Sequence, residues 1–202
     1  MITRNILACA MATLLAAPAI QAQAPATPPP ATPPAATPAP GGAPAATPGK
    51  PKPLSMNEGK ALTDLLEAMQ FHIRMGEVAR HKDKDDKELV AFANKNHKEM
   101  TEEFTPMVTL AQNNQLKNIP TEASKADKAD IAKLSKAKAD KWKQEYFELL
   151  AKNGKRNVRS TETALKSIND PAVKAAATKV AALMTSQTAA AEAKEKELKE
   201  KK

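Results

Sequence analysis

The chain has 202 residues, a formal net charge of +8 and a single cysteine, Cys9. One cysteine excludes an internal disulfide and a metal site built from several thiolates. The lysines alternate with acidic residues, and such a mixed-sign surface is a poor match for DNA, so we expect no nucleic-acid partner.

The first residues have the three parts of a secretory signal peptide. Arg4 supplies a positive charge, an apolar run follows it, and small residues come next at Ala22 and Ala24. The run is shorter than the roughly 20 apolar residues of a membrane-spanning helix. We predict a signal peptide over 1–22 that is cleaved after Ala22, with Ala19 and Ala24 as alternative sites. The protein is therefore expected to be periplasmic or secreted.

Residues 23–54 consist mostly of Ala, Pro, Thr and Gly, and they contain 12 of the 16 prolines. Such a segment buries nothing and favours the extended polyproline II conformation. We predict a disordered arm, which is a solvated tail after cleavage or a membrane tether if the signal peptide stays attached. Cys9 also allows a lipoprotein signal, but the eight residues before it are too few for a charged start and an apolar run.

The remaining chain, 55–202, is predicted to be one helical domain, because its apolar residues recur at spacings of three and four. The first helix starts at a capping box formed by Ser55 and Glu58 and runs to about His81. Gly76 lies on the apolar side of this helix. A glycine there predicts close approach of a neighbouring helix.

The second helix is predicted to start at another capping box, formed by Asp85 and Glu88, and its apolar stripe extends to Ala111. Pro106 lies inside the pattern. Because proline removes one backbone hydrogen bond, we expect a kink there, or a break with a restart from Thr105.

Three further helices follow. The first is short and rich in lysine, over about 125–136, and a long helix follows over about 139–166. Asp170 as a cap and Pro171 at the first helical position mark the start of the last helix. We therefore predict an all-α protein, a four-helix bundle with an extra short helix. An open helical array that closes by forming a homo-oligomer is the alternative.

A di-metal carboxylate site would be the obvious use of a four-helix bundle, but it needs Glu-x-x-His pairs on two helices. None of the three histidines, His72, His81 and His97, has that spacing. His72 and His97 lie near the middles of neighbouring helices, where two imidazoles would hold Cu, Zn or Fe weakly. The simpler interpretation is that both are polar residues tolerated in a core, and that the protein uses no cofactor.

A basic surface on the short helix and the start of the next one is a second candidate site. Its residues are Lys125, Lys128, Lys133, Lys136, Lys138, Lys141 and Lys143. It would contact an anionic envelope surface, or it is only a solvated face. The sequence contains no nucleophile elbow and no glycine-rich phosphate loop, so we expect that the protein is not an enzyme.

Three runs of sequence resemble an exported bacterial family known as domain of unknown function 4142. They are FHIRMGEVARHKDKDDKELVAFANKNHKEM, ADKWKQEYFELLAKNG and DPAVKAAATKVAALMTSQTAAA, and the resemblance spans roughly residues 60–192. It implies export and a ferritin-like helical bundle. The family tends to place histidines at positions that correspond here to Met100, Gly154 and Gln187. The resemblance therefore implies that any histidine site of the family has been lost.

These observations together predict a non-catalytic periplasmic protein that binds an envelope component or another protein, or that acts in envelope stress. A holdase for client proteins is one version of this function. The alternative is a ferritin-like metal-binding protein that uses His72 and His97.

Overall fold

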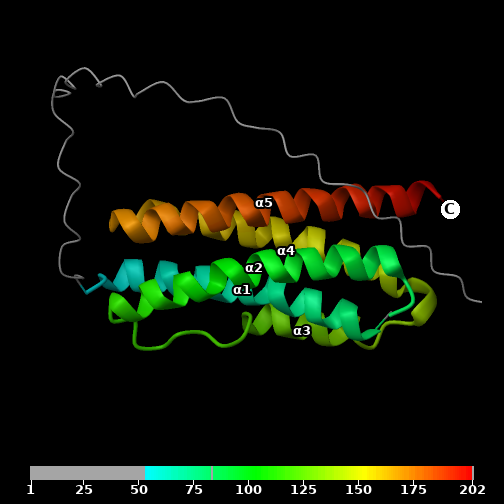
Figure 1. Ribbon diagram of the computed structural model, residues 1–202, viewed down its shortest axis with the longest axis horizontal. Helices are drawn as coiled ribbons and strands as arrows, with labels where there is room; N and C mark the ends of the chain where they lie inside the picture. Colours follow the sequence, from blue (N-terminus) through cyan, green and yellow to red (C-terminus); the bar gives the residue numbers. More distant parts are fainter. Residues whose placement is uncertain (1–52, 83, 202) are drawn as a thin grey trace, which may run out of the picture. The chain divides into compact units, whose positions relative to one another are not determined.

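The computed structural model describes residues 53–82 and 84–201, which form five helices and no strand. These are α1 (Met56–Lys82), α2 (Lys87–Asn113), α3 (Lys125–Leu134), α4 (Ala139–Ser167) and α5 (Pro171–Glu200) (Figure 1). The prediction of an all-α protein is confirmed. The predicted signal peptide and most of the predicted arm, residues 1–52, lie outside the described residues.

The four long helices form a bundle. α1 packs mainly against α2 and α4, and α5 packs mainly against α4 and, over smaller surfaces, against α2 and α1. The short helix α3 lies outside this set, against α4 and α1 (Figure 1). The predicted bundle with an extra short helix is thus observed, and its likeness to ferritin stays a prediction. Among the described residues, no helix combines the length and the hydrophobicity needed to cross a membrane.

The capping box at the start of α1 is confirmed. The backbone N–H of Ser55 donates to Glu58 Oε2 at 3.0 Å, and the N–H of Glu58 donates to Ser55 Oγ at 3.3 Å. Glu58 also accepts from the backbone N–H of Asn169 at 2.8 Å, so it ties the start of α1 to the α4–α5 connection. The Ser55 hydroxyl and these backbone donors favour the ionised carboxylate and lower the pKa of Glu58 to about 2.

The cap residue predicted for α2 is wrong, and so is a break at Pro106, whereas a kink there stays a prediction. The cap of α2 is Asp86 and not Asp85: Asp86 Oδ1 accepts from the N–H of Leu89 at 2.9 Å. Asp86 also pairs with Lys143 of α4 at 2.7 Å, a tertiary contact that the capping pattern does not reveal.

α2 neither ends nor restarts at Pro106. Pro106 lies on the exposed face, where water can satisfy the carbonyl group that loses its helical partner. The predicted start of α5 is confirmed, since Asp170 accepts from the N–H of Val173 at 2.8 Å.

The core consists of two apolar clusters that meet near the middle of the bundle. The first includes Leu62, Leu66, Met107, Val173 and Val180. The second includes Phe71, Met75, Leu89, Trp142 and Tyr146. Where the two clusters meet, each long helix contributes buried polar residues. We call this set the polar belt; its members are His72, Asn96, Asn153, Asn157, Gln187 and Thr188.

Candidate functional site

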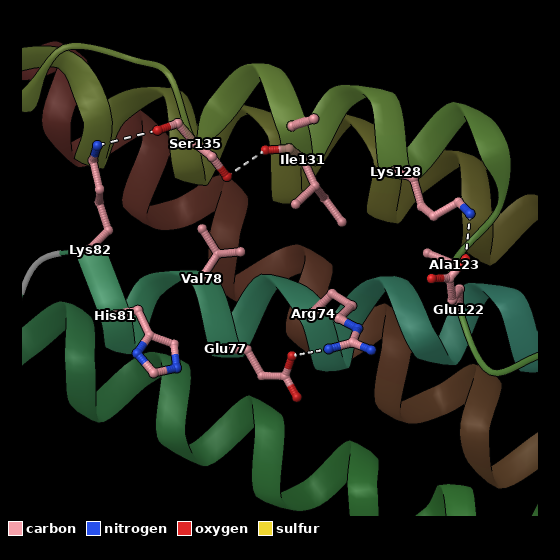
Figure 2. A pocket seen from close by; sticks show the side chains of 11 residues that line it. Arg74, Glu77, Val78, His81, Lys82, Glu122, Ala123, Lys128, Ile131 and Ser135 are labelled. Atoms are coloured by element: carbon pink, nitrogen blue, oxygen red, sulfur yellow. Dashed lines mark hydrogen bonds and ion pairs between the residues drawn. The ribbon is translucent and has the colours of Figure 1, made fainter.

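A groove of about 570 Å³ lies between the second half of α1 and α3. Figure 2 shows its lining from close by. Val78 of α1 and Ile131 of α3 point toward one another across it, and both are half-buried. Ala123 and Ala132 complete its apolar lining. The groove exists because α3 meets α1 only over a short distance and leaves this part of α1 uncovered by another long helix.

Charged side chains surround this apolar surface, and most of the cations are paired. Arg74 contacts Glu77 at 2.6 Å, both on α1, and Lys128 of α3 pairs with Glu122. The Lys128 ammonium lowers the pKa of Glu122 and keeps it ionised. At these positions the rim therefore consists of neutralised ion pairs and not of free charges.

Lys82 is different. Its Nζ donates to the carbonyl oxygen of Ser135 at 3.3 Å, which links the end of α1 to the end of α3 across the groove (Figure 2). Within the described residues this ammonium meets no carboxylate. An ammonium group has three N–H donors, so Lys82 retains donors for a further acceptor. As far as the described part of the chain shows, the groove thus has one end with a positive charge that is not neutralised.

The groove does not show the arrangement that nucleophilic catalysis needs. Its single hydroxyl belongs to Ser135, and this hydroxyl donates to the carbonyl oxygen of Ile131 at 3.0 Å and not to a base. His81 lines the groove from the exposed end of α1. A nucleophilic serine requires a base within hydrogen-bond reach of its hydroxyl. Ser135 is therefore not placed as the nucleophile of such a pair.

The predicted basic surface divides into two groups of lysines. Three of its members have acidic partners: Lys128 pairs with Glu122, Lys133 with Asp130, and Lys143 with Asp86 and Glu88. The other four are exposed and meet no acid among the described residues: Lys125, Lys136, Lys138 and Lys141. The last three lie at or next to the α3–α4 connection, close in sequence to Ser135 of the groove. A contact with an anionic envelope surface stays a prediction for these positions.

His72 lies in the polar belt and is 1% exposed. Neither ring nitrogen reaches a hydrogen-bond partner within the described residues. Burial disfavours the charged imidazolium and lowers the pKa of His72 to about 4, although the side chain of Gln187 opposes the shift. His72 is therefore neutral at physiological pH and lies beside Gln187 in the bundle interior.

His97 has other neighbours and lies at the edge of the α1–α2 interface. Its Nε2 is 3.8 Å from Glu77 Oε1, and its side chain is 21% exposed. Partial burial and the nearby Arg80 lower the pKa of His97, against the effect of Glu77. His97 thus lies beside the carboxylate of Glu77, whereas His72 lies beside the amide of Gln187. Among the described residues, no three His, Cys, Asp or Glu side chains are grouped to hold a metal ion.

Sequence reasoning missed most of the polar belt. Asn153 donates to Asp127 and Asp130 of α3 at 3.1 and 3.2 Å, and Gln187 donates to the backbone carbonyl of Asn96 at 3.2 Å. The sequence did contain one indication of the polar belt: these amides occupy inward positions of stripes that are otherwise apolar. The groove residues gave no signal of their own, since the site arises from the placement of α3.

The described part of the chain is therefore an all-α bundle with a groove on one side and a polar belt inside. Its sequence matches the family described as Domain of unknown function (DUF4142) over residues 43–194. The chain belongs to this family, and the resemblance noted from the sequence is confirmed. No curated protein and no solved structure matches the chain significantly.

Proposed function

We propose that this chain is an exported, non-catalytic binding protein of the periplasm, and that the groove between α1 and α3 is its binding site. The groove itself carries the proposal. Ligand sites are concave and mainly apolar, with volumes of about 300–1,000 Å³ and a few polar groups that orient the ligand. The groove has this volume, an apolar lining around Val78 and Ile131, and charged groups only at its rim.

Export is tested by location and by mass. The full gene product is expressed in a Gram-negative host, and the periplasmic fraction is separated from cytoplasm and membranes. We expect the chain in the periplasmic fraction, with an intact mass that corresponds to cleavage after Ala22, Ala19 or Ala24. A full-length chain that stays in the cytoplasm would rule export out.

Binding is tested with N-phenyl-1-naphthylamine, a neutral dye whose fluorescence rises in apolar surroundings. The exported chain should bind it saturably at one site. Ala132→Trp fills the groove from an exposed position of α3, so it should weaken dye binding at least tenfold. Ala129→Trp is the matched control, because Ala129 is equally exposed on α3 and does not line the groove. Non-saturable binding, or an equal response of both variants, would exclude the groove as a ligand site.

A metal-binding role for His72 and His97 has less support, because His97 lies beside Glu77, whereas His72 lies beside Gln187. Its test is thermal unfolding with and without Cu²⁺, Zn²⁺ and Fe²⁺, for the unmodified chain and His97→Leu. A ligand that binds only the folded state must raise the midpoint. A rise that His97→Leu abolishes would favour the metal role over the groove.

A further inference from the structure

We propose that the occupant of the groove is a fatty acid, which lays a single alkyl chain along the apolar surface and places its carboxylate at Lys82. This inference rests on the proposed function, since it names the ligand of the same groove. It is drawn from the distribution of apolar and charged groups along the groove.

The apolar part of the groove fits a chain better than a broad ring system. Val78 and Ile131 face each other from the two walls, and the alanines Ala123 and Ala132 leave open space beside them. At one end, Lys82 reaches across to Ser135, and at the other Lys128 pairs with Glu122 of the chain that leads into α3 (Figure 2). An elongated apolar surface that is closed by polar contacts at both ends suits an unbranched alkyl chain.

The charges of the groove select the head group. Arg74 and Lys128 are neutralised by Glu77 and Glu122, whereas within residues 53–82 and 84–201 Lys82 contacts only a neutral carbonyl oxygen. One ammonium without a carboxylate partner matches a ligand with one negative charge. A fatty-acid carboxylate carries that single charge. A phosphate monoester carries nearly two, which is more charge than one ammonium group neutralises.

The alkyl chain should supply most of the affinity, because Lys82 is exposed and an exposed ion pair adds little. Burying one methylene group strengthens binding by about fourfold, so two methylenes strengthen it by roughly fifteenfold. Affinity should therefore rise steeply with chain length and then level off when the groove is full. The carboxylate should add a smaller factor, about two- to fivefold.

The experiment uses the exported full chain and measures displacement of N-phenyl-1-naphthylamine by octanoate, decanoate, dodecanoate and tetradecanoate below their micelle concentrations. Dodecanol, dodecyl phosphate and dodecyltrimethylammonium are the head-group comparisons. Lys82→Gln removes the unneutralised charge, and Lys166→Gln is the matched control, because Lys166 is exposed on α4 away from the groove.

We expect roughly fifteenfold tighter displacement for each two-carbon step, and dodecanoate ahead of dodecanol, dodecyl phosphate and the cationic amphiphile. Lys82→Gln should make dodecanoate equal to dodecanol and leave dodecanol itself unchanged, while Lys166→Gln should behave like the unmodified chain. Ala132→Trp should weaken every member of the series.

Three results would overturn the inference. Dodecanol or dodecyl phosphate could displace the dye as well as dodecanoate or better, the affinities could be independent of chain length, or Lys82→Gln could leave the carboxylate preference unchanged. In each case the proposed binding function would still stand, provided that the dye binds saturably and that Ala132→Trp removes this binding. If the dye does not bind at all, both proposals fall together.

Discussion

Gly76 of α1 lies directly against His97 of α2, and a β-carbon on the glycine would be 2.7 Å from Cβ of His97. It would also be 3.0 Å from the carbonyl oxygen of Ala93. The predicted close approach at Gly76 is thus observed, and its partner is the helix that carries His97. The same contact holds His97 at the edge of the interface, beside Glu77.

Gly76→Ala should destabilise the fold by about 1–3 kcal/mol, because α1 and α2 must separate to admit the methyl group. The better helix propensity of alanine offsets up to about 1 kcal/mol of this loss. Gly59→Ala is the control, since its β-carbon would lie 3.6 Å from Leu116 Cδ1, an ordinary contact. Urea unfolding should show Gly59→Ala equal to or above the unmodified chain in stability. Equal effects of both substitutions would contradict the close packing at Gly76.

His72 should make the protein less stable in mild acid. Its pKa is about 4 in the folded state against 6.5 ordinarily, so the unfolded chain binds more protons below pH 6.5. The stabilising contribution is complete above pH 6.5 and is lost as the pH falls toward 4. Between pH 7.5 and 5 the unmodified chain should lose about 2 kcal/mol more than His72→Leu.

Urea unfolding at several pH values measures this difference. His81→Gln serves as the control, because His81 is exposed at the end of α1, so this substitution removes a histidine without changing the bundle interior. An unmodified chain and a His72→Leu variant with parallel pH profiles would show that His72 is not buried as a neutral imidazole.

Asp86→Ala should cost about 1–2 kcal/mol of unfolding free energy. It removes the cap of α2 and the ion pair with Lys143, in which both side chains are only partly exposed. Asp85→Ala should change stability by less than about 0.5 kcal/mol, since Asp85 is exposed and does not cap the helix. Thermal unfolding of the two variants side by side distinguishes them, and a larger loss for Asp85→Ala would reverse the assignment.

Pro106→Ala should stabilise the protein by about 1–2 kcal/mol. Alanine restores an N–H that donates to the carbonyl of Glu102 within α2, and the gain exceeds the added chain entropy of the unfolded state. Pro120→Ala lies in the connection between α2 and α3, where no helical hydrogen bond is regained, so it should give no increase. Chemical unfolding measures both. A loss of stability in Pro106→Ala would mean that proline is required at this position.

The features that sequence predicted well are those set by neighbouring residues. Ser55 with Glu58 and Asp170 with Pro171 mark helix starts because their hydrogen bonds lie within one turn. The prediction of Asp85 failed because it relied on Glu88 three residues later, whereas the cap is Asp86, which also contacts Lys143 of α4.

The groove and the polar belt depend on tertiary placement. Val78 and Ile131 are ordinary stripe residues, and nothing local indicates that α3 stops short of covering α1. Asparagine and glutamine side chains usually mark exposed helix positions, so Asn153 and Gln187 did not indicate an interior layer. Their burial follows from the position of all four long helices together.

The polar belt also bears on how the helices align along the bundle axis. Long apolar stripes repeat at every turn, so a helix displaced by about 5 Å would still find apolar neighbours. In the polar belt, such a slip would carry Gln187 away from the Asn96 carbonyl and place its amide inside an apolar cluster. A buried amide without a partner is costly. The belt therefore sets the register of the helices, and with it the point at which α1 ends beside α3.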